Sequence, residues 1–110
     1  MRKEDELFIR DILTVINLIE NFIQDIDFKR FIEDEKTKSA ILWQIHIIGE
    51  ATKKLSKDLT ENSKEIPWKY MAKMRDKIAH FYFGIDYEIS WDVIKNKLPI
   101  IKPLIEGLLK

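Results

Sequence analysis

The sequence contains no cysteine, which excludes disulfide bonds and thiolate metal ligands and fits a reducing cytoplasm. Its two histidines, His46 and His80, form no spaced cluster, so we expect no metal site built from this chain. The three glycines and three prolines leave little material for long loops, which favours helices. The 19 basic and 19 acidic residues cancel, so nucleic-acid binding would need a local patch of positive charge.

The sequence also lacks a segment that resembles a signal peptide or a membrane span. Charged residues run through the stretch MRKEDELFIR at the start of the chain. The most apolar run, residues 40–49, contains Gln44 and His46 and is too short to cross a bilayer. We therefore expect a cytoplasmic protein that does not associate with membranes.

What the sequence does contain is the profile of a folded protein. Its 110 residues are 45% hydrophobic and 35% charged, which fits one globular domain over residues 1–110. A domain of this size buries a limited share of its surface, so dimerisation would add stability.

Apolar residues recur every three or four positions along the first half of the chain, as they do in amphipathic helices. This spacing predicts a first helix over residues 4 to about 26, and one or two helical turns over residues 28–32. Asp34 can cap a second long helix that runs to about residue 57. Apolar residues lie on several faces of this second helix, so we expect it to be central in the bundle or to meet a second subunit.

The second half of the chain predicts a polar loop over residues 56–66. Pro67 can begin the next helix, because its missing amide would be unpaired there anyway, and Gly84 can end it in a left-handed conformation. Asp86 can cap a short helix to about residue 97, and Pro99 can begin a final helix. No long stretch alternates as a strand does. The predicted fold is all-α, a four-helix up-and-down bundle with one or two additional short helices.

The third predicted helix carries basic residues on the side opposite its apolar stripe. Met71, Met74 and Ile78 should face the core. The other side carries Lys69, Lys73, Asp76 and His80, with Lys77 at its margin. Lysines spaced by four repel one another, a cost that an RNA-binding face would tolerate. A plain solvated surface has the same pattern, so the lysines are candidates only.

Arg75 and His80 are the candidate catalytic residues. An imidazole can take a proton from a ribose 2′-hydroxyl near neutral pH, and an arginine can stabilise the charge on a phosphate under attack. On a helix, Asp76 lies four residues before His80 and can fix its tautomer. These groups suffice for RNA cleavage by transesterification without a metal.

The positions of Arg75 and His80 pose a geometric difficulty. Five residues apart on a straight helix, their side chains point about 140° away from each other. Either the helix is distorted near its end, or His80 of one subunit works with Arg75 of another across a two-fold axis.

The stretch RDKIAHFY, residues 75–82, matches the R-x4-H-x-Y motif of HepT-like proteins, a family of the HEPN superfamily of helical ribonucleases. The resemblance extends to IIGEATKKLS at 47–56, to IPWKYMAKMRDKIAH at 66–80 and to FGIDYEISWDVIKNKLP at 83–99. It therefore covers nearly the whole chain.

This resemblance implies a HEPN-type four-helix bundle that dimerises, with the two motifs lining a shared cleft. It implies an RNase toxin of a toxin–antitoxin pair, with an MntA-type nucleotidyltransferase as the antitoxin partner. In such pairs the antitoxin transfers AMP from ATP to the motif tyrosine, here Tyr82. The added bulk and negative charge would block the site and repel RNA. ATP would serve the partner, and the chain itself would need no cofactor.

Other residues have structural interpretations. His46 is expected to be a buried histidine with satisfied hydrogen bonds, and Glu50 to have a basic partner near the cleft. Trp43, Trp68 and Trp91 can stack on bases, but their spacing among apolar neighbours favours core or interface positions.

A second function remains open from the sequence. The chain could be a non-catalytic helical dimer that binds nucleotides or holds a nucleotidyltransferase. Toxicity on expression that His80→Ala relieves would distinguish a toxin from such a scaffold.

Overall fold

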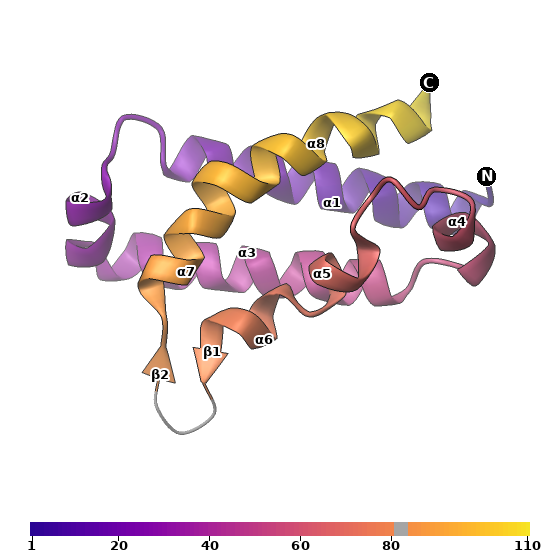
Figure 1. The fold of residues 1–110 in the computed structure, drawn as a ribbon. Coiled ribbons are helices and arrows are strands. Elements are labelled where there is room, and N and C mark those ends of the chain that lie inside the picture. Colours follow the sequence, from indigo (N-terminus) through magenta and orange to yellow (C-terminus); the bar gives the residue numbers. More distant parts are fainter. Residues whose placement is uncertain (81–83) are drawn as a thin grey trace.

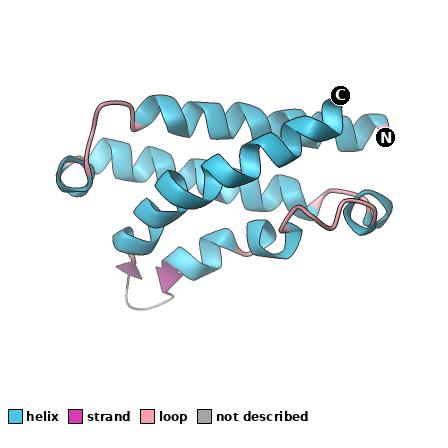
Figure 2. Ribbon diagram, turned by 45° about the horizontal axis from the view of Figure 1, so that its top comes forward, coloured by secondary structure: helices cyan, strands magenta, loops and turns pink. Residues whose placement is uncertain are grey.

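The computed structural model describes residues 1–80 and 84–110, with side chains described up to Ile78 and from Gly84 onward. Four helical segments run up and down along the molecule (Figure 1). They are α1 (Lys3–Phe22), α3 (Glu35–Lys53), α5 (Trp68–Ala72) with α6 (Met74–Ile78), and α7 (Tyr87–Asp92), which continues through a π-helical turn (Val93–Lys97) into α8 (Leu98–Glu106) and a 3₁₀ turn (Gly107–Leu109). Two short helices, α2 (Phe28–Glu33) and α4 (Lys57–Glu61), lie in the connections. The predicted all-α bundle is confirmed, and helices dominate the described chain in Figure 2.

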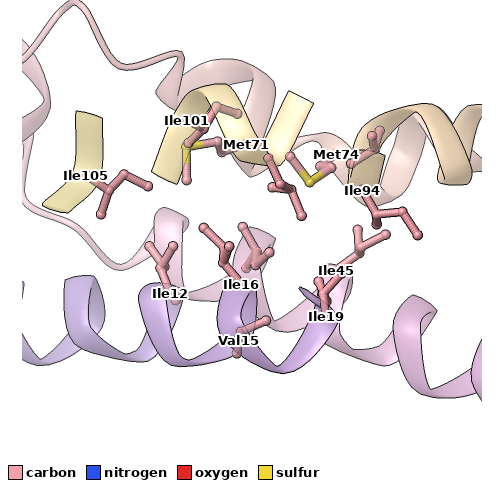
Figure 3. Close-up of a cluster of buried hydrophobic side chains, with 14 of the residues drawn as sticks. Ile12, Val15, Ile16, Ile19, Ile45, Met71, Met74, Ile94, Ile101 and Ile105 are labelled. Carbon is pink, nitrogen blue, oxygen red and sulfur yellow. The ribbon is translucent and has the colours of Figure 1, made fainter. Parts of the chain in front are cut away.

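The core lies where the apolar faces of the four segments meet, as Figure 3 shows. The face of α1 is made of isoleucines spaced by three and four residues, and α3 supplies a second isoleucine stripe. The fully buried side chains include Ile9, Ile12 and Ile16 of α1, Ile41, Ile45 and Ile48 of α3, and Met71, Met74 and Ile78 of α5 and α6. The predicted core face of the third helix is therefore confirmed.

Side-chain caps set the starts of α2, α3, α4 and α7. The Asp34 carboxylate accepts from the Thr37 amide at 3.1 Å, and Asp86 accepts from the Ile89 amide at 3.0 Å, as predicted for both. Ser56 caps α4 by accepting from the Leu59 amide at 3.2 Å, so the prediction of a loop over residues 56–66 was wrong for residues 57–61. The first two long helices are also shorter than predicted, ending at residues 22 and 53 rather than near 26 and 57.

Asp5 ties the start of α1 to the end of α3. Its side chain is buried, and its carboxylate accepts hydrogen bonds from the Ser56 amide at 2.9 Å and the Ser56 hydroxyl at 2.6 Å. Burial by itself would raise the pKa of Asp5, but the bonds from Ser56 and the positive charges of Arg2 and the N-terminus outweigh it, so the pKa lies below its ordinary value. The ionised carboxylate is therefore a stabilising link between two helix ends.

We expect Asp5→Asn to lower the free energy of unfolding at pH 7 by about 1–3 kcal/mol, because the amide cannot accept both Ser56 bonds as an anion does. A carboxylate with a depressed folded-state pKa stabilises above its unfolded pKa and loses this contribution as the pH falls through the folded value. The difference in free energy of unfolding between wild type and Asp5→Asn should thus shrink below about pH 4. Urea unfolding at pH 7 and pH 3 measures this difference, and Asp11→Asn, at an exposed position, is the control. An equal difference at both pH values would contradict the assignment.

Gly49 brings the third helical segment close to α3. A Cβ at this position would lie 3.3 Å from the backbone oxygen of Ala72, which is tighter than ordinary van der Waals contact. The absence of a side chain therefore lets α5 pack closely on α3, and α6 follows directly along the same face. This packing places the beginning of the RDKIAHFY motif beside the middle of α3.

The third helix is not continuous to Gly84, and this prediction was wrong in two places. The backbone leaves helical geometry at Lys73 (φ −108°, ψ 8°), which separates α5 from α6. Helix α6 then ends at Ile78, and residues Ala79–His80 (β1) pair antiparallel with Gly84–Ile85 (β2). Gly84 does adopt the predicted left-handed conformation (φ +88°), but in a strand pair instead of a helix cap. Pro67 occupies the N-cap position, so α5 begins one residue later, at Trp68.

An aromatic cluster holds the return of the chain after β2. Phe31 of α2 lies 5.1 Å from Trp91 and 6.2 Å from Tyr87 between ring centroids, and Phe28 lies 6.0 Å from Trp91. Because Tyr87 and Trp91 both belong to α7, these contacts fix α7 against α2. The strand pair is therefore anchored on both sides, by α6 and by α7.

None of the helices in the described part of the chain is long and apolar enough to cross a membrane.

Candidate active site

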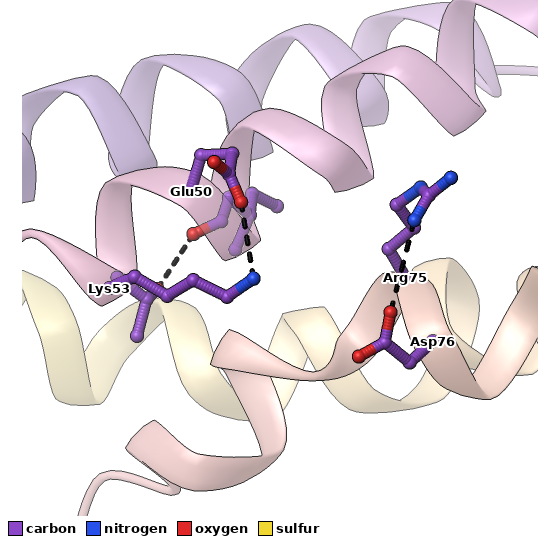
Figure 4. Close-up of polar contacts among 6 residues, drawn as sticks. Glu50, Lys53, Arg75 and Asp76 are labelled. Carbon is purple, nitrogen blue, oxygen red and sulfur yellow. Dashed lines mark hydrogen bonds and ion pairs between the residues drawn. The ribbon is translucent and has the colours of Figure 1, made fainter.

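Arg75 lies on α6, the last helical stretch before β1. Its side chain is 54% exposed, and its Nη1 atom lies 3.9 Å from Oδ1 of Asp76, which is itself exposed. Figure 4 shows the guanidinium extending from α6 towards α3, with the Asp76 carboxylate beside it. A contact of this length in water constrains the arginine weakly. The guanidinium is therefore available to an anionic ligand.

Arg75 lines a surface pocket of about 320 Å³ between α6 and α3. The other lining residues come from α3 and are Ser39, Leu42, Trp43 and His46. The pocket thus combines a fixed positive charge, an imidazole, a hydroxyl and a large aromatic ring. This combination suits a ligand that has both a negative charge and a flat polar ring.

His80 follows Arg75 by five residues but does not share its helix. Because α6 ends at Ile78 and His80 belongs to β1, the 140° separation of a straight helix does not apply. The backbone therefore leaves the helix before His80, which is one of the two arrangements expected from the sequence. For the same reason Asp76 and His80 are not one helical turn apart, so the contact expected from that spacing no longer follows. The imidazole of His80 and the whole of Tyr82 lie outside the described residues.

The three lysines do not form one straight helical stripe. Lys73 occupies the break between α5 and α6, so Lys69 and Lys77 belong to different helices. All three are exposed. The ammonium of Lys77 lies 5.5 Å from the ring centroid of Tyr70, and Lys69 lines a second pocket of about 910 Å³ with Lys57 and Lys64. The three lysines are therefore exposed positive charges on two helices and at the break between them.

The structure corrects the expected burial of two residues of the pocket. Trp43 is 59% exposed and does not occupy the core position that was one of its two expected places, and His46 is half-buried instead of buried. Their ring centroids lie 5.4 Å apart with 38° between the planes. Both also line a neighbouring pocket of about 460 Å³ against α1. Of the other tryptophans, Trp68 is buried and donates to Ser63 at 3.0 Å, as expected for a core residue.

Glu50 has the basic partner that was expected, but on its own helix. Its carboxylate accepts from the Lys53 ammonium at 3.2 Å, and both side chains are exposed (Figure 4). This hydrogen bond and the charge of Lys53 lower the pKa of Glu50 below its ordinary value. Glu50 is therefore an ionised surface residue near the pocket of His46.

Among the side chains that the structure describes, no group of three or more histidine, aspartate or glutamate residues is arranged to hold a metal ion.

Comparison with known proteins assigns the chain to a class. The profile of the family described as "Ribonuclease HepT-like" matches residues 12–108. A Methanocaldococcus jannaschii protein named "Putative RNase" is 41% identical over 99% of this chain and 90% of its own length. The Thermococcus cleftensis protein named "Probable ribonuclease HepT" is 40% identical over the full length of both chains. The chain therefore belongs to the HepT-like ribonuclease family, whose substrate is RNA.

A more distant relative from Caldanaerobacter subterraneus, also named "Putative RNase", is 33% identical over 94% of this chain and 92% of its own length. No solved structure was found to match the chain.

Proposed function

We propose that this protein is the toxin of a toxin–antitoxin pair and that it cuts RNA internally, without a metal ion, through Arg75 and His80. The observation that carries the proposal is the exposed Arg75 guanidinium of α6 in a surface pocket, with His80 two residues after the end of that helix, in a chain of the HepT-like ribonuclease family. The chain would act as one HEPN-type domain over residues 1–110.

The proposed reaction is a transesterification. The His80 imidazole removes the proton from a ribose 2′-hydroxyl, and the oxygen forms a bond to the adjacent phosphorus. The bond from phosphorus to the 5′-oxygen breaks, and that oxygen takes a proton from water as it leaves, while His80 returns its proton to the solvent. The products are a 2′,3′-cyclic phosphate and a free 5′-hydroxyl. Arg75 stabilises the negative charge that builds up on the phosphate oxygens.

Neighbouring residues would support this chemistry. The Asp76 carboxylate, 3.9 Å from the Arg75 guanidinium, would contribute a weak electrostatic contact beside it. Lys69, Lys73 and Lys77 are exposed cations on α5, at the break after it and on α6, and they would contact RNA phosphates. Because they lie on two helices and the break between them, each would meet a different phosphate.

We infer that the active enzyme is a homodimer with a composite site, in which Arg75 of one protomer works with His80 of the other. A two-fold dimer is the commonest oligomer, and one whose axis passes close to the motif brings its two copies together. Exposed large apolar side chains on α1, namely Leu7, Leu18 and Phe22, support an interface.

Regulation would come from an MntA-type nucleotidyltransferase, the antitoxin. The Tyr82 oxygen would attack the α-phosphorus of ATP bound to that partner, with loss of the phenolic proton and departure of pyrophosphate. AMP on Tyr82 places a phosphodiester two residues from His80, where it competes with RNA for Arg75.

Mixing two inactive variants tests the nuclease and its composite site together. We expect Arg75→Ala and His80→Ala each to be inactive, and their equal mixture after subunit exchange to regain up to about a quarter of wild-type activity. In a mixed dimer one site carries both substitutions and the other carries neither. Gel analysis of a fluorescent RNA follows the reaction. If Arg75 and His80 act within one chain, no mixture regains activity, and the composite site is contradicted while the nuclease is not.

A further inference from the structure

Trp43 is a large apolar ring near the middle of α3, and it lies outside the hydrophobic core. It is 59% exposed on α3, whereas Trp68 is buried and Trp91 is packed against Phe28 and Phe31. An isolated exposed aromatic residue is ordinary, but this one lines the same pocket as the Arg75 guanidinium. A ring and a cation that share a pocket suggest a ligand with a ring and a negative charge.

We propose that the pocket formed by Ser39, Leu42, Trp43, His46 and Arg75 is a subsite for one unpaired base of single-stranded RNA, stacked on Trp43. This inference rests on the proposed function, because it takes the phosphate held by Arg75 to be the one next to that base. It assigns Trp43 the role of a substrate-binding residue outside the Arg–His motif.

The geometry of the pocket fits a nucleotide. Its volume of about 320 Å³ lies at the lower end of the range of small-ligand pockets, roughly 300–1,000 Å³. One wall is apolar, from Leu42 and the Trp43 ring, and offers a stacking surface. The Ser39 hydroxyl and the His46 imidazole supply hydrogen-bonding groups for the edge of the base. The indole and imidazole rings are neighbours in the pocket, with centroids 5.4 Å apart and 38° between their planes.

Stacking requires a base that is free of a duplex. The ring of an unpaired base presents its face to the indole, whereas in a double helix both faces are covered by neighbouring bases. Transesterification also needs a flexible ribose that can bring its 2′-oxygen in line with the phosphorus. The subsite therefore selects single strands, loops and bulges over duplex RNA.

A second copy of this chain is the competing occupant of the pocket, since tryptophan and arginine are common at protein interfaces. If another protein chain covered Arg75, the guanidinium would be buried. The contact that the structure describes between this guanidinium and the Asp76 carboxylate is 3.9 Å long, too long for a close ion pair. Such burial is costly unless the partner supplies a matched anion. RNA brings its own phosphate together with the base, so both halves of the pocket are satisfied by one ligand.

Binding to RNA that cannot be cut tests the subsite independently of catalysis. The probe is a short fluorescent 2′-O-methyl RNA of mixed sequence, measured by anisotropy at fixed salt, beside the same backbone without bases. Removing one stacking partner should weaken binding of the intact probe about tenfold in Trp43→Ala. Trp43→Phe should keep most of the affinity, because a phenyl ring still stacks. Neither variant should change binding of the abasic probe, whereas Arg75→Ala should weaken both.

Matched controls separate the possible results. Ile100→Ala removes a side chain that is 66% exposed on α8 and should leave binding unchanged. Equal binding of the intact probe by wild type and Trp43→Ala overturns the subsite, even if the protein cleaves RNA. Tryptophan-dependent binding without any cleavage would support the subsite and contradict the nuclease. A change of oligomeric state in Trp43→Ala, measured by light scattering, would show an interface between copies and also overturn the subsite.

Discussion

In a buffer with excess EDTA, the unmodified protein will cleave single-stranded RNA, and either Arg75→Ala or His80→Ala will nearly abolish the reaction. Loss of the general base should cost about a hundred- to ten-thousandfold in rate, and loss of the charge-stabilising cation about a hundred- to thousandfold. Because the two residues act on the same transition state, the double variant should lose little more than the worse single variant. Rates of appearance of the cyclic-phosphate product measure all three.

Two controls accompany this experiment, an arginine variant outside the site and the addition of Mg²⁺. The Arg10→Ala variant lacks an exposed arginine of α1 that pairs with Glu6 at 3.6 Å, and this variant should cleave RNA as wild type does. Adding Mg²⁺ back should not raise the rate. Activity that appears only with Mg²⁺ would contradict the metal-independent mechanism. If mass spectrometry finds Tyr82 unmodified and several RNA classes stay intact, the non-catalytic scaffold replaces the nuclease as the better interpretation.

AMP transfer to Tyr82 will silence the enzyme, and this is the second large effect that we expect. Incubation with the partner nucleotidyltransferase and ATP should add AMP to Tyr82 and reduce cleavage to the level of Arg75→Ala, because the added phosphodiester competes with RNA for the guanidinium. Tyr82→Phe should keep its nuclease activity and resist silencing. In cells, expression of the wild type alone should stop growth, co-expression of the partner should restore it, and Tyr82→Phe should remain toxic in both cases.

A second tyrosine serves as the control for this modification. Tyr70 is half-buried on α5 with the Lys77 ammonium over its ring, so Tyr70→Phe keeps the aromatic surface and removes only a hydroxyl. It should be silenced as readily as the wild type. AMP found on Tyr70, or a Tyr82→Phe protein that is still silenced, would show that the modification acts elsewhere.

Local signals in the sequence were sufficient to predict the two long helices and their starts. The caps of Asp34 and Asp86 join a carboxylate to an amide three residues away, so they depend on no other part of the chain. The cap of α4 could not be recognised as easily, because Ser56 is held in place by Asp5, 51 residues earlier. The resulting helix is only one turn long and has no apolar stripe of its own.

The end of the third helix could not be predicted from periodicity because its cause lies outside the helix, in residues that follow it in the chain. The stripe of Met71, Met74 and Ile78 has the same spacing with or without the break at Lys73. What ends α6 is the pairing of Ala79 with Ile85 and the hydrogen bond from the Asp86 amide to the Ile78 oxygen at 2.7 Å. Periodicity reports which residues are apolar, and it does not report where a strand partner lies.

The candidate site was predicted in part for a similar reason. The motif led to Arg75 directly, since its residue types carry the chemistry. Trp43 and His46 stand among isoleucines in the sequence, so their neighbours suggested a buried position. Their exposure depends on which faces of α3 are covered by α1, α5 and α6, and that is decided by packing in three dimensions.

Both ends of the described chain emerge at the side of the bundle where α4 lies, whereas β1 and β2 project where α6 gives way to α7 (Figure 1). A tag or fluorescent reporter joined to either end would thus lie away from the region of the motif. The protein can therefore be followed in cells, or attached to a surface for binding measurements, without an added domain placed over Arg75.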